Sequence, residues 1–340
     1  MIIGMTYDLK TEYVFKRGDP PDANAEFDHP LTIGVIEDAF QELGHRVVRI
    51  GSAEHLLKKL DHLCVDLVFN IAEGLQGRNR ESQVPVILEM RGVPYIGADG
   101  LTQALTLDKL MAKKIFLAEG IPTPRFFELH HPDQALPPDI AFPLIVKPRF
   151  EGSSKGLSEK SVARSARELR AQAAWLIHTY RQPAIVEEFI QGTEFTVAVI
   201  GNDPLEAWPV VQIQIDGQTD LGDLFYTFSR IAEGAGYLVP AKIDRALQEK
   251  LKELAVRVYR AVDCRDFGRV DFRVDKAGNP YALEINPLPS LSTEDVFAVL
   301  ATHLGLSYTQ MIGRILDAAV KRLGMKVREP RASKMAGQRK

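Results

Sequence analysis

The first hundred residues alternate short apolar runs with segments whose apolar positions recur every three or four residues. The runs IIGMTY, VVRI, VDLVFNI and VPYIG predict strands, and a helix-spaced apolar stripe between the first two ends at Gly44. This alternation predicts an α/β fold with a parallel sheet covered by helices on both faces. The polar segment from Lys10 to Pro30 is then a long loop after the first strand, where ligands bind in such sheets.

The pattern changes near residue 105. The segment LTLDKLMAKKIFLAEG predicts one helix that ends at Gly120, and proline-rich connections follow it. The strand LIVK, a loop rich in glycine and serine, a helix through Trp175 and the strand AIVEEF come next. We therefore place a domain boundary near residue 105.

Strands dominate from Thr193 onward until a helix with a closely 3.6-periodic apolar stripe between Leu247 and Val262. The hairpin FGRVDFRVDKAGNPYALEIN and a last amphipathic helix up to Leu323 follow. The predicted division is 1–105, 106–190 and 191–325, followed by a basic tail over 326–340.

Length and charge narrow the classes of function. At about 150 residues per domain, 340 residues form two domains or three small ones. With 42 basic against 45 acidic residues the net charge is −3, which gives no electrostatic footprint for nucleic acid or an anionic membrane. The longest stretch without Asp, Glu, Lys or Arg, from Val296 to Gly313, is too polar to span a bilayer. The two cysteines form no disulfide framework, so we expect a cytoplasmic protein. From the balanced charge and the polar stretch we expect no nucleic-acid or membrane partners.

The hairpin is the most informative segment, because strand alternation sorts its side chains onto two faces. It predicts Tyr281, Leu283 and Ile285 on an apolar face and Glu284 and Asn286 opposite. Three oxygen ligands next to an arginine suit Mg²⁺ and phosphate, although a solvated polar face is the commoner fate of such a hairpin. The residues expected on the polar surface are Arg269, Asp271, Glu284 and Asn286.

Two further segments favour nucleotide binding. In LIVKPRFEGSSKG, Lys147 ends an apolar strand and precedes a loop whose backbone N–H groups could close over phosphates. This loop is not a P-loop, because GxxxxGK followed by Ser or Thr is absent. In VEEFIQGTEFTV, the glutamates Glu187, Glu188 and Glu194 could accept hydrogen bonds from ribose hydroxyls.

Together with LTLDKL, these motifs stand in an order that resembles the ATP-grasp superfamily, and within it the D-alanine–D-alanine ligases, over roughly residues 60–325. The resemblance implies an N-terminal α/β domain plus central and C-terminal α+β domains that enclose ATP and two Mg²⁺ ions. It implies that Lys109 and Lys147 contact phosphates, with Ser153 in the phosphate loop. The other implied roles are adenine contact for Glu187, Glu188, Phe189 and Ile190, ribose contact for Glu194, metal binding for Asp271, Glu284 and Asn286, and contact with the reacting carbonyl for Arg269.

The implied reaction joins two small amino acids. A carboxylate attacks the γ-phosphate of ATP to form an acyl phosphate, an amine then attacks it, and Arg269 stabilises the oxyanion. By resemblance the product is D-alanyl-D-alanine, a precursor in peptidoglycan biosynthesis, and a homodimer is one expected assembly. The alternatives are a related amino-acid or dipeptide ligase with other substrates and a nucleotide-binding protein without turnover. A dehydrogenase is excluded, because no GxGxxG follows a predicted strand.

The substrate side departs from the family pattern. The family's GGxSxE loop is absent, and Glu26 or Asp28 could supply its carboxylate. EGLQGRNRE, residues 73–81, replaces HGxxGEDG, and the family's mobile Lys-Tyr pair aligns with Ser229 and Arg230, which makes Arg230 a catalytic candidate. The serine that clamps the second substrate's carboxylate falls at Asp295, unless the alignment slips and Ser292 or Thr293 takes that role.

Overall fold

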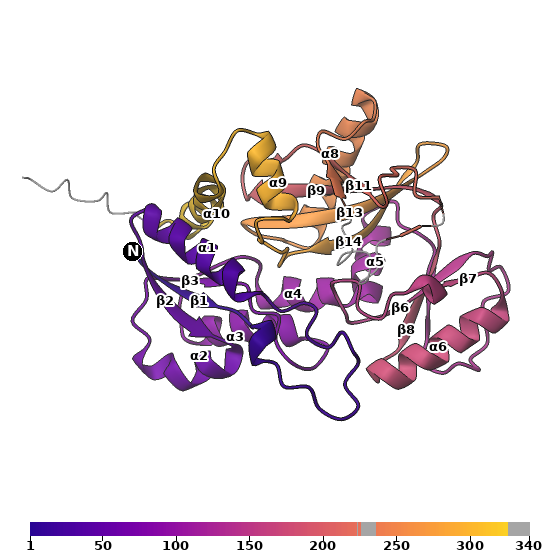
Figure 1. Ribbon diagram of the computed structural model, residues 1–340, viewed down its shortest axis with the longest axis horizontal. Coiled ribbons are helices and arrows are strands. Elements are labelled where there is room, and N and C mark those ends of the chain that lie inside the picture. The colour runs from indigo at the N-terminus through magenta and orange to yellow at the C-terminus, as the bar shows by residue number, and fades with distance from the viewer. Residues whose placement is uncertain (223, 226–235, 326–340) are drawn as a thin grey trace, which may run out of the picture.

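The computed structural model describes residues 1–222, 224–225 and 236–325. Three sheets follow one another along the chain (Figure 1). The first is parallel, in the order β2-β1-β3-β4, as the sequence predicts. Its strands are β1 (Ile2–Thr6), β2 (Arg46–Gly51), β3 (Leu67–Asn70) and β4 (Tyr95–Ile96). The helices of this region are α1 (Pro30–Glu42), α2 (Ala53–Lys59), α3 (Gln83–Met90) and α4 (Gly100–Leu107), with 3₁₀ turns η1 (Lys10–Glu12), η2 (Leu60–His62) and η3 (Arg80–Ser82).

The second sheet is antiparallel, in the order β5-β8-β6-β7. Its strands are β5 (Phe126–Leu129), β6 (Leu144–Pro148), β7 (Val162–Ala163) and β8 (Ala184–Glu188). Helix α6 (Ala166–Tyr180) begins at the N-cap Ser165 and buries Leu169, Ala173 and Leu176 against the sheet. Helix α5 (Lys109–Ala118) precedes this sheet, and the 3₁₀ turn η4 (Glu159–Ser161) leads into β7.

The third sheet runs β12-β11-β9-β13-β14, with β10 paired to β9. Its strands are β9 (Gly192–Gly201), β10 (Leu205–Ala207), β11 (Val211–Gln214), β12 (Gly236–Leu238), β13 (Phe267–Asp275) and β14 (Pro280–Asn286). Helix α8 (Arg245–Ala261) packs its predicted apolar stripe into the same core as the buried side chains of β9 and β13. Helices α9 (Val296–His303) and α10 (Tyr308–Leu323) pack on the first sheet's side, where α10 contacts α1 (Figure 1).

A chain of aromatic rings joins the first and third sheets. Phe40 on α1 contacts Phe69 on β3, with ring centroids 5.2 Å apart. Phe69 stacks on Phe267 of β13 at 6.2 Å, and Phe267 meets Phe297 of α9 at 6.1 Å. These four rings are fully buried, so the two sheets share one apolar core.

The structure corrects two local predictions. The helix expected as one piece is broken at Asp108 into α4 and α5, and α4 itself runs through residue 105. A β-bulge lies in β14, since Asp271 pairs with Glu284 while the next residue, Phe272, pairs with Ala282. The bulge reverses the alternation, so that Ala282 enters the core in place of Tyr281 and Leu283.

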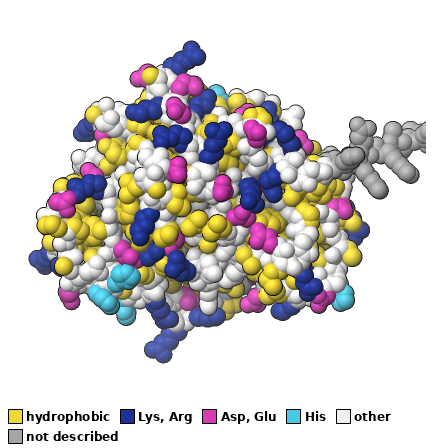
Figure 2. All heavy atoms as spheres, turned by 180° about the vertical axis from the view of Figure 1, so that it is seen from behind, with side chains coloured by type: hydrophobic (Ala, Val, Ile, Leu, Met, Phe, Trp, Pro, Cys, Tyr) yellow, Lys and Arg dark blue, Asp and Glu magenta, His cyan; other side chains and the backbone are white. Residues whose placement is uncertain are grey.

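Within the described residues no single helix is long and apolar enough to cross a membrane. Helices α9 and α10 pass that test only as a pair, and the chain bends by 108° between them. On the face shown in Figure 2, basic and acidic side chains are interspersed among apolar ones, in keeping with the nearly balanced charge.

Candidate active site

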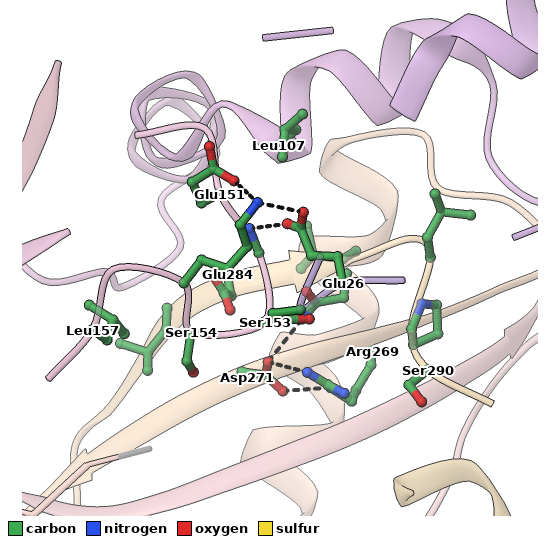
Figure 3. Close-up of a pocket in the computed structure, with 18 of the residues that line it drawn as sticks. Glu26, Leu107, Glu151, Ser153, Ser154, Leu157, Arg269, Asp271, Glu284 and Ser290 are labelled. Atoms are coloured by element: carbon green, nitrogen blue, oxygen red, sulfur yellow. Dashed lines mark hydrogen bonds and ion pairs between the residues drawn. The ribbon is translucent and has the colours of Figure 1, made fainter. Parts of the chain in front are cut away.

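A cavity of about 530 Å³ brings together the residues that the sequence analysis singled out. Figure 3 shows part of its lining. Arg230 lies outside the described residues, so its predicted role stays a prediction. The predicted residues that line the cavity are Glu26, Lys109, Lys147, Ser153, Glu187, Glu188, Phe189, Ile190, Glu194, Arg269, Asp271, Glu284 and Asn286.

The hairpin of β13 and β14 presents the predicted metal ligands side by side. Asp271 stands opposite Glu284, and Arg269 opposite Asn286. Arg269 donates from Nε and Nη2 to the two oxygens of Asp271, each at 3.0 Å, and the Asn286 side chain donates to Asp271 at 2.9 Å. Two carboxylates and an amide oxygen at one place suit Mg²⁺, which prefers oxygen ligands, so the donor set fits the ion.

The break between α4 and α5 positions Lys109. Asp108 is fully buried, caps α5 through Met111 N, and accepts two hydrogen bonds from Arg149 at 2.6 Å. The first residue of α5, Lys109, then pairs with Glu284 at 3.0 Å across the cavity. Burial opposes ionisation of Glu284, but the charges of Lys109 and Lys147 outweigh it and lower its pKa to about 2. Glu284 therefore stays ionised, as a metal ligand requires.

Lys147 and Lys113 share the buried carboxylate of Glu187. Their Nζ atoms lie 3.1 and 3.4 Å from Glu187 Oε2. Burial disfavours the ionised form, yet the two lysines hold the pKa of Glu187 below its usual value. Its other oxygen, Oε1, is buried and has no hydrogen-bond partner among the described residues. An orphaned acceptor in a cavity wall suits a ligand donor such as the amino group of adenine.

Apolar side chains also line the cavity. Phe189 and Ile190, which follow Glu187 by two and three residues, are buried in the lining, and the guanidinium of Arg273 lies 4.7 Å above the Phe189 ring. Leu283, which the bulge turns out of the core, joins the lining. Apolar side chains next to an unsatisfied acceptor suit a purine base.

The predicted phosphate loop lies against the N-terminal region. Ser153 and Ser154 both have left-handed backbones, with φ of 44° and 56°. Gly152 donates its N–H to Glu26 at 2.5 Å, and a Cβ at this glycine would stand only 2.8 Å from the Glu26 carboxylate. The glycine therefore permits the close approach between this loop and Glu26.

Both carboxylate oxygens of Glu26 accept hydrogen bonds from other residues of the protein. It accepts from Arg80 at 2.6 Å and from Lys155 at 3.0 Å, besides Gly152. Burial opposes its ionisation, but Arg80 and Lys155 keep its pKa below the usual value. Asp28 also lines the cavity, and burial raises its pKa to about 7.

Asp295 caps helix α9. Its Oδ1 accepts from Val296 N at 2.8 Å and from the Tyr237 hydroxyl at 2.9 Å. Asp295 lines the cavity and so does Ser292, whereas Thr293 is not part of the lining that the structure describes. The structure thus keeps Asp295 and Ser292 as candidates for contact with a second substrate.

Sequence reasoning assigned no site role to several residues that line this cavity or contact its lining. Lys113 follows Lys109 by four residues, so helical spacing was a usable signal. Arg80 and Lys155 act through Glu26, which only the folded structure reveals. Glu73 and Glu81 stand in the segment that departs from the family pattern, and both line the cavity.

Comparison with known proteins agrees with this geometry. The family described as D-ala D-ala ligase C-terminus matches residues 115–317. A protein of Sinorhizobium fredii, described only as uncharacterized protein y4sG, is 36% identical over 84% of this chain and 86% of its own length. The D-alanine–D-alanine ligase of Desulforamulus reducens is 31% identical over 81% of this chain and 88% of that protein.

Solved structures agree on the fold. The D-alanine–D-alanine ligase from Bacillus anthracis complexed with ATP superposes with a TM-score of 0.73 at 22% identity, covering 95% of this chain and 98% of that one. The VanG D-Ala:D-Ser ligase from Enterococcus faecalis gives 0.70 at 21% identity, covering 94% and 99%. The family model and the relatives define an ATP-grasp protein, and the solved structures confirm the predicted fold class. Within that class, the chain belongs to the D-alanine–D-alanine ligase family.

Proposed function

We propose that this protein is an ATP-dependent carboxylate–amine ligase that joins two small amino acids through an acyl phosphate. The observation that carries the proposal is the convergence of two lysines, a carboxylate pair and an arginine on one cavity. Family membership supports the same reaction, with D-alanyl-D-alanine as the default product. The complete charged set disfavours a nucleotide-binding protein without turnover.

Each residue has a distinct task in this proposal. Glu187, Phe189 and Ile190 hold the base, while Lys109 and Lys147 offset phosphate charge as point charges. Asp271, Glu284 and Asn286 would hold Mg²⁺, which supplies further neutralisation of the phosphates. Glu194 binds the ribose, and Ser153 in the phosphate loop binds the phosphates.

The chemistry forms one bond at each step and breaks another. The donor carboxylate oxygen attacks the γ-phosphorus, and the bond from that phosphorus to the β-phosphate oxygen breaks, which gives an acyl phosphate and ADP. The acceptor amine attacks the acyl carbon, loses a proton, and inorganic phosphate leaves. Arg269, a fixed cation beside Asp271, is placed to stabilise the oxyanion.

We also propose the domain boundaries, the cellular location and the assembly of this protein. The three sheets span 2–96, 126–188 and 192–286, which supports the division at 105 and 190. Cytoplasmic location and homodimeric assembly remain part of this proposal.

A panel experiment tests the function. ATP-dependent phosphate release is measured with single D- and L-amino acids and their pairs, and the products are identified by mass spectrometry. Release that requires an amino acid and yields a dipeptide supports the ligase. Amino-acid-independent hydrolysis, or nucleotide binding without any turnover, refutes it.

Asp295 favours a second candidate, a related ligase whose acceptor differs from D-alanine. A carboxylate there would repel the carboxylate of an incoming amino acid in a partly desolvated site. We expect the unaltered protein to use D-alanine poorly as acceptor, and Asp295→Ser to improve that use about tenfold, corresponding to ~1.4 kcal/mol. The rate of dipeptide formation at fixed donor concentration measures it. Efficient D-alanyl-D-alanine synthesis that Asp295→Ala leaves unchanged would show that D-alanine is the acceptor.

A further inference from the structure

Lys113 on helix α5 is a buried lysine behind the wall of the cavity. Only 1% of the residue is exposed, and it is not among the described residues that line the cavity. Its ammonium lies 3.4 Å from Glu187 Oε2 and donates to the Thr123 hydroxyl at 2.9 Å. An apolar side chain of similar length would fill this space at a lower desolvation cost, so the charge indicates a role beyond packing.

Glu187 stands between this lysine and the cavity. Its Oε2 faces both Lys113 and Lys147, whereas its Oε1 is buried and has no hydrogen-bond partner among the described residues. Lys147 itself lines the cavity, where we assign it to the phosphates of ATP. Lys113 is then the cation that stays with Glu187 when a nucleotide is bound, while Oε1 remains available to a ligand donor.

The charges of this pair support each other. Burial lowers the pKa of Lys113 to about 8, which still leaves its ammonium charged at pH 7. Burial opposes ionisation of Glu187, but Lys113 and Lys147 hold its pKa below the usual value. An ionised carboxylate can only accept hydrogen bonds, whereas a protonated one can also donate. Lys113 therefore helps to keep Glu187 a pure acceptor.

Thr123 ties Lys113 to the hairpin that carries the predicted metal ligands. Its hydroxyl donates to Ala282 O at 2.8 Å, and Ala282 N donates to Pro122 O at 2.8 Å. Ala282 lies next to the bulge of β14. Helix α5 contacts both β5 of the second sheet and β14 of the third (Figure 1). The position of the Lys113 ammonium is thus fixed from both sheets.

We propose that Lys113 is a positioning residue for the choice of nucleotide base. It holds Glu187 ionised and oriented, so that Oε1 accepts from the 6-amino group of adenine and repels the 6-oxo group of hypoxanthine or guanine. Lys113 contacts neither base nor phosphate and acts through Glu187. This inference rests on the proposed function in taking ATP as the nucleotide.

The experiment measures nucleotide binding without turnover. Full-length protein with Mg²⁺ is titrated calorimetrically with ADP, inosine diphosphate and purine riboside diphosphate, none of which has a γ-phosphate to transfer. At position 6 of the base, the second ligand carries an oxo group and the third a hydrogen. We expect ADP to bind at least about tenfold more tightly than either, because only ADP donates a hydrogen bond to the carboxylate.

Lys113→Met should reduce the preference for ADP over inosine diphosphate to less than about threefold, because a protonated Glu187 can donate to the 6-oxo group. Thr123→Val removes only the hydroxyl that holds the ammonium and should reduce the preference by a smaller factor. Lys114→Met, at the exposed next position of α5, is the matched control and should change none of the three affinities.

A double variant shows whether Lys113 acts through Glu187. Glu187→Gln should itself remove most of the preference, because an amide can turn its N–H groups toward a 6-oxo group. Adding Lys113→Met to Glu187→Gln should then change the preference no further. A purely structural role of Lys113 would instead weaken all three diphosphates equally.

Four results overturn the inference: the wild type does not prefer ADP, Lys113→Met keeps the preference, it weakens all three ligands equally, or its effect persists with Glu187→Gln. If Lys113→Met does not fold, an unchanged preference in Thr123→Val overturns it. A protein that binds no ADP refutes the proposed function as well. If the preference responds as expected but no amino acid drives phosphate release, the proposed function fails while the role of Lys113 stands.

Discussion

At the scale of single residues, the pKa of each carboxylate in the cavity depends on how close a cation lies to it. Glu284 has Lys109 at 3.0 Å and keeps a pKa of about 2 in spite of burial. Glu81 has no cation closer than 3.8 Å, and burial raises its pKa to about 7. Burial acts on both carboxylates, but the nearby lysine keeps Glu284 ionised, as its proposed role as a metal ligand requires.

Glu284→Gln and Asp271→Asn should abolish turnover and leave the fold intact. Each variant removes one charged ligand at the surface of a hairpin rather than a core side chain, and we expect phosphate release to fall at least about 100-fold, or ~2.7 kcal/mol of barrier. Thermal unfolding checks the fold, and Glu253→Gln on the exposed face of α8 serves as the control. Activity near that of the wild type in either variant would contradict the metal assignment.

Glu81 also makes stability depend on pH. Its pKa is raised from 4.5 to about 7, so the folded protein holds a proton that the unfolded chain releases. The bound proton therefore contributes fully to the free energy of unfolding below pH 4.5. This contribution, about 3 kcal/mol, is lost as pH rises through about 7. Glu81→Gln should raise the melting temperature by about 4 °C at pH 8 and leave it nearly unchanged at pH 4.

Melting curves of the ligand-free protein at these two pH values measure the effect. Part of the slope remains in the variant, because burial also raises the pKa of Asp28 and of Glu73. Equal changes of melting temperature at both pH values would show that Glu81 is ionised throughout and has a donor.

At the scale of elements, the long loop after β1 fastens the phosphate loop. Asp22 accepts a hydrogen bond from Gly156 N at 2.8 Å, and the Tyr180 hydroxyl at the end of α6 donates to it at 2.8 Å. Glu26 adds its bond to Gly152 in the same loop. A segment of the N-terminal region therefore holds both ends of a loop that belongs to the second sheet.

Asp22→Ala should loosen this attachment. It leaves the buried Gly156 N–H without an acceptor, which costs about 1–3 kcal/mol, or roughly 1–4 °C in melting temperature for a chain of this size. We also expect weaker binding of an ATP analogue, because the phosphate loop must be ordered at the moment of binding. Tyr180→Phe removes only one donor and should produce the smaller loss in both measurements. An unchanged nucleotide affinity in Asp22→Ala would show that the loop is ordered without the N-terminal segment.

Local patterns predicted most elements, and long-range contacts account for the failures. The parallel strands and amphipathic helices follow from apolar periodicity, which lies within each segment. The break at Asp108 depends on Arg149, 41 residues away, so helical periodicity alone extended α5 too far. The bulge in β14 likewise depends on pairing with β13, and strict alternation misplaced Tyr281 and Leu283.

The same distinction holds for the site. The polar face of the hairpin could be predicted, because Asp271, Glu284 and Asn286 each alternate with apolar neighbours in their own strand, and the apolar Val270 and Ile285 pair with each other. The cluster of Glu26, Glu73 and Glu81 could not, since these residues meet only when the loop before α1 folds against residues 73–81. The sequence departure at residues 73–81 marked the place without indicating its partners.

At the scale of the whole molecule, Asp266 joins the first sheet, the third sheet and the last helix. It is fully buried and accepts from Gly97 N just after β4 at 2.8 Å and from the Asn202 side chain after β9 at 3.0 Å. Arg322 of α10 donates to both of its oxygens, at 2.8 and 2.7 Å. Because this joint lies apart from the cavity lining, it should contribute to assembly of the fold rather than to chemistry.

Asp266→Asn should therefore destabilise the whole protein while leaving nucleotide binding intact. Removing one partner of a buried ion pair costs about 3–5 kcal/mol, which is roughly 4–7 °C in melting temperature for a chain of this size. Asp263→Asn is a close control, because Asp263 also has a left-handed backbone, with φ of 51° against 66° for Asp266, but is exposed. Asparagine tolerates this backbone, so the difference between the two variants isolates the ion pair. If Asp266→Asn melts no earlier than Asp263→Asn, the shared aromatic core alone holds the sheets together; if it also weakens binding of an ATP analogue, the joint and the cavity are coupled.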